Sequence, residues 1–311
     1  MGKVKVINSH VFKQLVEKSI PSSRVIKLDA TWYMPNNPKN AKQEFLNQAR
    51  IPGSGYFDLD EICDPNSKYP HMLANYDILN SSLNGLGLNK SDKLVFYDKS
   101  GIFSSPRAAW NLILGGHEQV FLLDHYKDYV NEGNEVSKEP VDDFRPQAVT
   151  TNGYEMISGE AYSKNYAQQV IEYEELLELV STGKLAEQYI TFDARSNDRF
   201  SGAAPEPRPG LPSGHVPSSL NLPFTKVLNE NGNFKSKSEL VDLFKADYGL
   251  DLTKSVNGRK GIIVMCGTGV TAVILRVAIE SILESPIPIK VYDGSWTEWA
   301  QRAPTELIVK D

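Results

Sequence analysis

The sequence predicts an α/β protein built from two similar domains, each with a parallel β-sheet flanked by helices. Three observations support this prediction. The chain has 311 residues, about twice the usual length of one domain. Short apolar strands alternate with helical stretches, which is typical of parallel sheets. The same order of elements also occurs twice along the chain, which indicates a duplicated domain.

The two copies can be aligned element by element. In the first copy the expected strand, proline turn, strand, helix and strand lie at residues 25–31, 51–53, 93–97, 105–115 and 120–124. In the second copy they lie at residues 189–195, 216–217, 261–265, 270–283 and 291–293. The first strand of each copy ends in Asp-Ala, and the second ends at Asp98 in one copy and at Cys266 in the other. Only one copy therefore carries a thiol at this position.

The segment between the copies is polar and has no sustained hydrophobic period. It predicts a linker, after which a helix at residues 173–180 opens the second domain and Gly183 ends that helix. The predicted limits are 1–140 for the first domain, 141–168 for the linker and 169–311 for the second domain.

Composition excludes several classes of function. The net charge is −6 with no lysine- or arginine-rich block, which argues against direct nucleic-acid binding. Two cysteines and scattered histidines lack the spacing of metal ligands, and no cofactor motif is convincing. No apolar stretch approaches a membrane span, and the N-terminus lacks a signal peptide. We expect a soluble cytoplasmic protein, with mitochondria as an open second location.

Cys266 is the candidate nucleophile. It follows an apolar strand and precedes Gly267-Thr268-Gly269-Val270-Thr271, where a helix begins. Ligands of parallel sheets bind beyond the carboxyl ends of the strands. Glycines let such a loop wrap tightly, so that its N–H groups and the helix N-terminus favour a thiolate over a thiol. Cys63 lies among acidic residues that disfavour a thiolate, and we interpret it as structural.

Three other interpretations of the loop have to be weighed. Cys266 could be an inert core cysteine, although such cysteines rarely stand in a Gly-x-Gly loop. The run 267–272 fits a dinucleotide-binding fingerprint, but too little chain follows to complete that fold. A cysteine phosphatase needs an arginine where Ala272 stands, so the loop has no fork for a phosphoryl group.

The loop resembles the active loop of 3-mercaptopyruvate sulfurtransferases, which belong with the tandem rhodanese-like proteins. Residues 193–202 and 292–299 are similar to two further family segments, as are residues 29–35, 57–60 and 69–72 of the first half. The resemblance spans nearly the whole chain. It implies two tandem rhodanese-like domains, of which the first is non-catalytic because Asp98 replaces the cysteine. The opening at 29–33 looks like that of fungal relatives that supply sulfur for tRNA thiolation.

The resemblance also implies roles for individual residues. Arg199 and Arg208 match arginines that hold the substrate carboxylate and keto group, and a guanidinium fork suits a planar carboxylate. Without the match, surface ion pairing would be the simpler interpretation of both. Asp60, His71 and Thr268 match a proposed Asp–His–Ser proton relay, with Thr268 keeping the hydroxyl. His215 and Trp296 match positions that support the site. The remaining predicted substrate-binding residues are Gly267, Gly269, Val270 and Thr271.

The expected reaction is sulfur transfer from 3-mercaptopyruvate through a persulfide on Cys266. Gly267 and Thr268 stand where thiosulfate-using rhodaneses carry Arg and Lys, which favours a carboxylate-bearing thiol as the donor. The acceptor would be a small thiol, thioredoxin, cyanide or a cysteine of a sulfur-relay protein. Two alternatives remain, a thiosulfate sulfurtransferase and a non-catalytic rhodanese-like interaction module.

Overall fold

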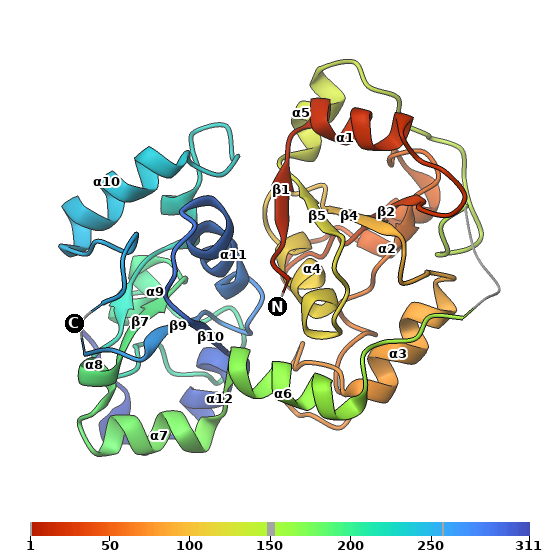
Figure 1. Cartoon of the computed structure of the whole chain (residues 1–311). Helices are drawn as coiled ribbons and strands as arrows, with labels where there is room; N and C mark the ends of the chain where they lie inside the picture. Colours follow the sequence, from red (N-terminus) through yellow and green to blue (C-terminus); the bar gives the residue numbers. More distant parts are fainter. Residues whose placement is uncertain (1, 148–152, 257) are drawn as a thin grey trace. The chain divides into compact units, whose positions relative to one another are not determined.

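The computed structural model describes residues 2–147, 153–256 and 258–311 (Figure 1). These residues form two compact units. Unit 1 comprises Met1–Asn66 and Leu73–Asn165, and unit 2 comprises Ser67–Met72 and Tyr166–Asp311. A short segment of the first half of the chain therefore belongs to unit 2.

Unit 1 is an α/β unit in which strands and helices alternate along the chain. Its elements are β1 (Lys5–Ile7), α1 (Ser9–Glu17), β2 (Val25–Asp29), α2 (Ala41–Asn47), β3 (Gly55–Tyr56), α3 (Tyr76–Gly85), β4 (Lys93–Tyr97), α4 (Ser105–Leu114), β5 (Val120–Leu123) and α5 (Tyr126–Asn131). Helix α6 (Gly159–Gln169) begins in unit 1 and ends in unit 2.

Unit 2 repeats this alternation. Its strands are β6 (Val170–Ile171), β7 (Tyr189–Asp193), β8 (Leu220–Asn221), β9 (Gly261–Met265) and β10 (Ile289–Tyr292). Its α-helices are α7 (Tyr173–Ser181), α8 (Leu185–Gln188), α9 (Asn197–Ser201), α10 (Lys237–Tyr248), α11 (Ala272–Val277) and α12 (Ser295–Arg302). The 3₁₀-helices η1 (Phe224–Val227) and η3 (Thr305–Leu307) and the π-helical turn η2 (Ala278–Ile282) complete the unit.

The two sheets have the same topology. In the described chain each has five strands, in the orders β1-β5-β4-β2-β3 and β6-β10-β9-β7-β8. The strand pairs are parallel in both sheets. Asp29 pairs with Tyr97 in one sheet, and Asp193 pairs with Met265 in the other. Asp98 and Cys266 therefore follow equivalent strand ends, and the predicted duplication of a parallel α/β fold is confirmed.

Helices cover both faces of each sheet (Figure 1). In unit 1, α1 and α5 pack on one face through Phe12, Tyr126 and Tyr129. In unit 2, α7 and α12 pack on one face through apolar residues that include Trp296 and Trp299. Central strands such as β7 and β9 are buried on both faces because helices cover them, which is why they form continuous apolar runs in the sequence.

Among the predicted segments, the helix at 270–283 and the linker at 141–168 differ most from the structure. Helix α11 begins at Ala272 rather than at Val270, because Val270 and Thr271 form the turn that leaves the loop. The predicted linker 141–168 contains the start of α6, a polar helix with a weak hydrophobic period, whose Tyr162 is buried and donates a hydrogen bond to the Ala74 carbonyl. Residues 148–152 of that linker lie outside the described residues.

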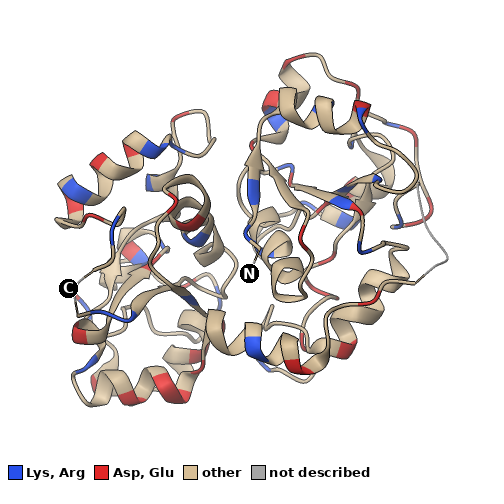
Figure 2. Cartoon of the chain, in the orientation of Figure 1, with Lys and Arg blue, Asp and Glu red and all other residues tan. Residues whose placement is uncertain are grey.

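Charged residues of both signs are mixed along the elements of each unit (Figure 2). Within the described parts of the chain, helices are too short or too polar to cross a membrane. The described residues also contain no group of three or more His, Cys, Asp or Glu side chains that could hold a metal ion.

Candidate active site

Cys266 lies directly after β9, at the carboxyl edge of the unit 2 sheet. Strand β9 is flanked by β10 and β7 on its two sides. The residue is 2% exposed and its thiol is free. Because the carboxyl ends of parallel strands are where such sheets bind ligands, the fold presents Cys266 at the expected edge.

The loop after Cys266 offers backbone donors. Gly269 has a φ of +75°, a conformation that a side chain would strain, so glycine is needed there. Within the described chain, the N–H groups of Gly267, Thr268, Val270 and Thr271 donate to no protein acceptor. Such unused donors can stabilise a negative charge without reorganisation, which suits a thiolate or a persulfide.

The first turn of α12 holds the start of this loop. The Cys266 N–H donates to Ser295 Oγ at 3.1 Å, and Ser295 Oγ donates to the Tyr292 carbonyl at 2.8 Å. The Trp296 N–H donates to the Cys266 carbonyl at 3.0 Å. Thr297 donates to the Gly267 carbonyl through both its N–H and its Oγ1, at 2.9 and 2.7 Å. These bonds leave the backbone of Cys266 and Gly267 little freedom.

Arg199, on α9, lies against this loop. Its Nη2 is 3.0 Å from the position that a Cβ on Gly267 would occupy. The guanidinium forms a fork with the carboxylate of Glu206, with Nε and Nη2 donating at 3.2 and 2.5 Å. Arg199 Nη1 has no acceptor among the described residues. One edge of the guanidinium is therefore held by the protein, while the other remains available beside the loop.

Behind Arg199 lies a buried charge network. Arg195 donates to both carboxylate oxygens of Asp193, to Glu206 Oε1 at 2.8 Å and to the Gly214 carbonyl at 2.7 Å. Its guanidinium lies 4.3 Å from the centre of the Trp296 ring. Asp193, Arg195 and Glu206 side chains are 0–3% exposed. Two arginines and two carboxylates thus compensate each other, which is the condition for burying such charges.

The predicted residues are partly brought together. Cys266, Arg199 and the loop residues Gly267, Thr268, Gly269, Val270 and Thr271 lie in one unit, with Arg199 against Gly267. Arg208 belongs to the same unit and is partly buried in the turn that follows Glu206.

The predicted relay involves both units. His71 and Thr268 lie in unit 2 and are each 6% exposed. Asp60 lies in unit 1 and accepts a hydrogen bond from Trp32 Nε1 at 3.1 Å. The relay stays a prediction.

The candidate site contains several residues that the sequence did not predict. Ser295, Thr297, Arg195 and Glu206 were not predicted, although the run Tyr-Asp-Gly-Ser-Trp holds Ser295. His215 and Trp296 pack as supports: His215 stacks on Phe200 with ring centroids 3.9 Å apart, and Trp296 Nε1 donates to the Pro212 carbonyl. A strand-end Asp-x-Arg pair is a sequence signal for the Asp193–Arg195 ion pair, but no local pattern reveals Glu206.

The equivalent loop of unit 1 is built around a carboxylate. Asp98 Oδ2 accepts the N–H groups of Phe103, Ser104 and Ser105 at 2.9–3.1 Å and the Ser105 hydroxyl at 2.6 Å. Burial raises the pKa of Asp98 to about 6, although these bonds oppose the rise. The loop after β4 thus forms an anion-binding site in unit 1, and the carboxylate of Asp98, which belongs to the same loop, occupies it.

Cys63 has the surroundings of an unreactive thiol. Its Sγ donates to the Asp60 carbonyl at 3.1 Å. Burial and then the nearby carboxylates, Asp60 foremost, raise the pKa of the Cys63 thiol. A raised pKa leaves little thiolate on Cys63 at neutral pH.

Comparison with known proteins identifies the class. Two parallel-sheet units in the same strand order, one with a cysteine loop, define a tandem rhodanese-type protein, and residues 172–302 match the rhodanese-like domain family. The chain is 36% identical over 307 residues to "Thiosulfate sulfurtransferase TUM1" of Saccharomyces cerevisiae, covering 98% of each chain. It is 34% identical over 305 residues to "3-mercaptopyruvate sulfurtransferase" of Mus musculus, covering 94% of this chain and 91% of the other.

Solved structures agree in fold. The crystal structure of Tum1 from Saccharomyces cerevisiae has a TM-score of 0.86 and 33% identity, covering 100% of this chain and 99% of the other. A sulfur transferase subunit of yeast mitochondrial complex I has a TM-score of 0.80 and 34% identity, covering 99% of both. The protein belongs to the thiosulfate/3-mercaptopyruvate sulfurtransferase family. It is an enzyme, a sulfurtransferase, as the sequence predicted.

Proposed function

We propose that Cys266 is the nucleophile, that 3-mercaptopyruvate is the sulfur donor, and that the sulfur is held as a persulfide. The observation that carries the proposal is the arrangement at the end of β9. Cys266 stands at the carboxyl edge of the sheet, and the guanidinium of Arg199 lies against the next residue, Gly267. The proposed nucleophile is therefore followed directly by the residue against which the proposed carboxylate-binding guanidinium lies.

The reaction follows from these two groups. The thiolate of Cys266 attacks the sulfur of 3-mercaptopyruvate, the S–S bond forms and the C–S bond breaks. The carbon keeps the electron pair and leaves as the enolate of pyruvate, which then takes up a proton. Loop N–H groups stabilise the negative charge on sulfur. A second nucleophile then attacks the outer sulfur and regenerates the Cys266 thiolate.

The geometry of Arg199 supports a donor with a planar carboxylate. Glu206 accepts hydrogen bonds from one edge of the Arg199 guanidinium. The edge carrying Nη1 can therefore donate two hydrogen bonds to a second carboxylate. Gly267 and Thr268 add no positive charge for a dianion such as thiosulfate. Arg208 is assigned to the keto group of the donor. The mouse relative's name supports this donor. The yeast relative's name keeps thiosulfate as the second candidate.

Proton movement is assigned to Asp60, His71 and Thr268, of which Thr268 is a neighbour of Cys266 in the loop. The acceptor is a thiol: a small thiol, thioredoxin or a cysteine of a sulfur-relay protein that feeds tRNA thiolation, with cyanide as an artificial acceptor. The net charge of −6 supports a protein acceptor over direct binding of RNA. We assign the protein to the cytoplasm with a mitochondrial fraction, which the mitochondrial relative supports.

Mass spectrometry tests the nucleophile. After incubation with 3-mercaptopyruvate and no acceptor, the Cys266 peptide should gain the mass of one sulfur atom while the Cys63 peptide should not. Cys266→Ser should abolish turnover, and the matched variant Cys63→Ser should keep it. An unmodified Cys266 peptide under turnover conditions would contradict the proposal.

Donor and acceptor are tested by rates. Initial rates with 3-mercaptopyruvate should exceed those with thiosulfate at equal concentration; the reverse order would favour the second candidate. If the protein were instead a non-catalytic interaction module, iodoacetamide at neutral pH would label Cys266 no faster than Cys63. Single-turnover transfer from the persulfide to thioredoxin, a small thiol and a relay-protein cysteine ranks the acceptors.

A further inference from the structure

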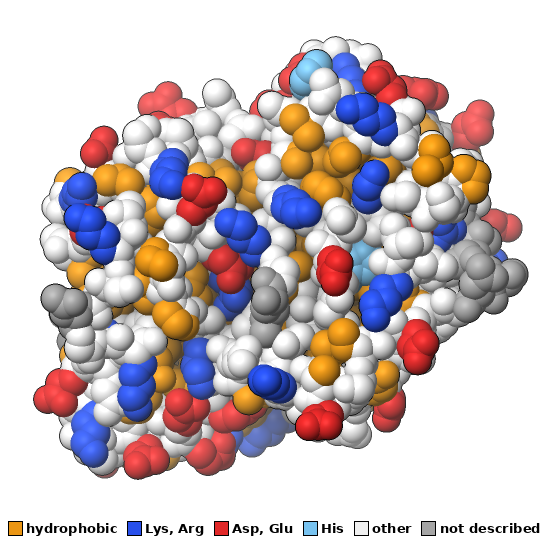
Figure 3. Space-filling view, viewed as in Figure 1, with side chains coloured by type: hydrophobic (Ala, Val, Ile, Leu, Met, Phe, Trp, Pro, Cys, Tyr) orange, Lys and Arg blue, Asp and Glu red, His pale blue; other side chains and the backbone are white. Residues whose placement is uncertain are grey.

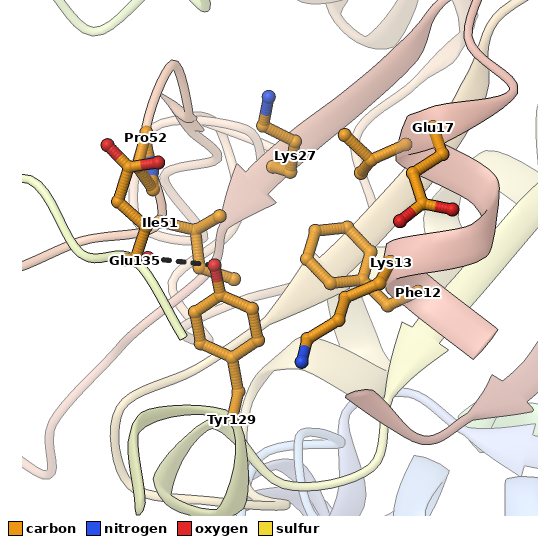
Figure 4. Close-up of a pocket in the computed structure, with 9 residues that line it drawn as sticks. Phe12, Lys13, Glu17, Lys27, Ile51, Pro52, Tyr129 and Glu135 are labelled. Atoms are coloured by element: carbon orange, nitrogen blue, oxygen red, sulfur yellow. Dashed lines mark hydrogen bonds between the residues drawn. The ribbon is translucent and has the colours of Figure 1, made fainter. Parts of the chain in front are cut away.

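Unit 1 contains a pocket of about 300 Å³ beside α1 (Figure 4). Its apolar wall consists of Phe12 and Val16 of α1, Ile51 and Pro52 of the turn before β3, and the ring of Tyr129 of α5. The volume is at the small end of the range in which proteins hold small molecules. Apolar side chains gather over α1 and α5 on the surface as well, with basic residues beside them (Figure 3).

Lys27 brings a charge into this apolar space. It stands in the middle of β2 on the face that α1 and α5 cover, and its side chain lies between Pro52 and the labelled residues of α1 (Figure 4). The side chain is partly buried. Among the described residues, Lys27 Nζ forms no ion pair and no hydrogen bond. Burial therefore lowers the pKa of Lys27 with nothing to offset it.

The turn at Gly53 brings the backbone close to the amine. A Cβ on Gly53 would lie 3.4 Å from Lys27 Nζ and 3.0 Å from Gln147 Oε1. Gly53 has a φ of +71°, so this position is suited to glycine for the turn as well. The space beside the amine is thus bounded by a glycine and by one amide oxygen, which does not neutralise its charge.

The other charged residues of the pocket are exposed and stand at its rim. Lys13 and Glu17 project from α1, and Glu135 lies on the opposite side (Figure 4). The hydroxyl of Tyr129 donates to the Glu135 carbonyl at 2.8 Å. The carboxylates of Glu17 and Glu135 at the rim repel a ligand with several negative charges. Lys27, inside the pocket, favours a ligand with a single negative charge.

We propose that this pocket binds a small monocarboxylic acid with an apolar body. The carboxylate pairs with Lys27 Nζ, and the body lies on Phe12, Ile51 and Tyr129. The partly buried ammonium of Lys27 has no ion-pair partner among the described residues, and a ligand carboxylate supplies one beside the apolar wall. The apolar body fills the rest of the pocket by the hydrophobic effect. The site is separate from Cys266, which belongs to unit 2.

The probe for the test is hexanoate, and hexanamide, which has the same shape without the charge, is its control. Calorimetric titration of the full chain should show saturable binding of hexanoate and binding of hexanamide about tenfold weaker or more, since a hydrogen-bonded charge pair is lost. Lys27→Met keeps the apolar stem and should weaken hexanoate to the level of hexanamide. The matched rim variant Lys13→Met should change hexanoate binding by no more than about threefold.

Absence of saturable hexanoate binding to the wild-type chain would overturn the proposal. Equal affinities for hexanoate and hexanamide would do the same, and this comparison holds even if Lys27→Met folds poorly. Equal hexanoate binding by Lys27→Met and wild type would show that the amine is not the partner. Sulfur transfer by Lys27→Met should match the wild type, because Lys27 has no part in the proposed reaction, and the thermal midpoint of the variant serves as the check on folding.

Discussion

Replacement of Arg199 by lysine separates the charge of this side chain from its geometry. Arg199 uses Nε and Nη2 for Glu206 and keeps the edge with Nη1 for a substrate carboxylate. A lysine carries the same charge on one nitrogen, which cannot serve Glu206 and a substrate along two separate edges. Long-range attraction of the donor is retained, so the variant keeps the charge and removes the guanidinium geometry toward both Glu206 and the proposed substrate carboxylate.

The magnitude follows from the bonds lost. A bidentate charge-assisted contact that is reduced to one weak contact costs about 1.5–3 kcal/mol, which corresponds to about 10–150-fold in kcat/KM for 3-mercaptopyruvate. Folding should change little, because Glu206 keeps its bond from Arg195. The matched control is Arg145→Lys, whose arginine pairs with Asp143 on the surface, and there kcat/KM should change by less than about twofold.

Steady-state kinetics with 3-mercaptopyruvate and a fixed thiol acceptor measure the effect, with thermal unfolding recorded in parallel. A kcat/KM for Arg199→Lys within about twofold of the Arg145→Lys control would show that Arg199 does not bind the substrate carboxylate through two hydrogen bonds. The assignment of Arg199 would then be wrong, whereas the persulfide on Cys266 would not be affected by that result.

Three further changes test neighbouring features. Gly267→Ala puts a Cβ 3.0 Å from Arg199 Nη2 and should shift the guanidinium slightly, so kcat/KM falls by about three- to tenfold with little change in thermal midpoint; an unchanged rate would contradict it. Ser295→Ala removes the acceptor of the Cys266 N–H and should cost about 1–3 kcal/mol of stability, seen as a lower thermal midpoint; an equal midpoint would refute the role of this bond. Asp98→Asn tests the raised pKa of about 6: the stability linked to protonation is present below about pH 4 and is lost as pH rises through about 6. The variant should therefore gain on the wild type by up to about 3 kcal/mol between pH 4 and pH 7.5, and a pH-independent difference would contradict it.

The central strands of both sheets could be predicted because their burial on both faces leaves a continuous apolar run. Strands β2, β4, β7 and β9 match the predicted segments closely. Strands β1 and β6 were not predicted, since they have three and two residues and carry no usable pattern. Helix α9 is five residues long and highly charged, so its helical period is too short to detect.

The site could be predicted only as far as its local motifs reach. Cys266 and its glycines are consecutive, and the strand before them predicts where they lie. The bonds that hold the loop come from Ser295 and Thr297, about thirty positions later in the chain. Glu206 becomes meaningful only once folding brings it between Arg195 and Arg199. Contacts of that kind depend on tertiary packing, which composition and periodicity do not encode.

The two loops give the strongest physical reason for the proposal that unit 2 is the reactive copy. In unit 1, three consecutive N–H groups and a hydroxyl already bind Asp98 Oδ2, so that loop has its anion built in. In unit 2, Cys266 stands at the equivalent strand end, and N–H groups of the described loop still lack protein acceptors. The same backbone design therefore has two outcomes. A carboxylate satisfies the donors permanently and closes the site, whereas a thiol leaves them for a charge that exists only during turnover. Duplication of the fold supplies the same loop twice, and we propose that the side chain at one strand end, Asp98 or Cys266, decides whether the loop supports structure or sulfur transfer.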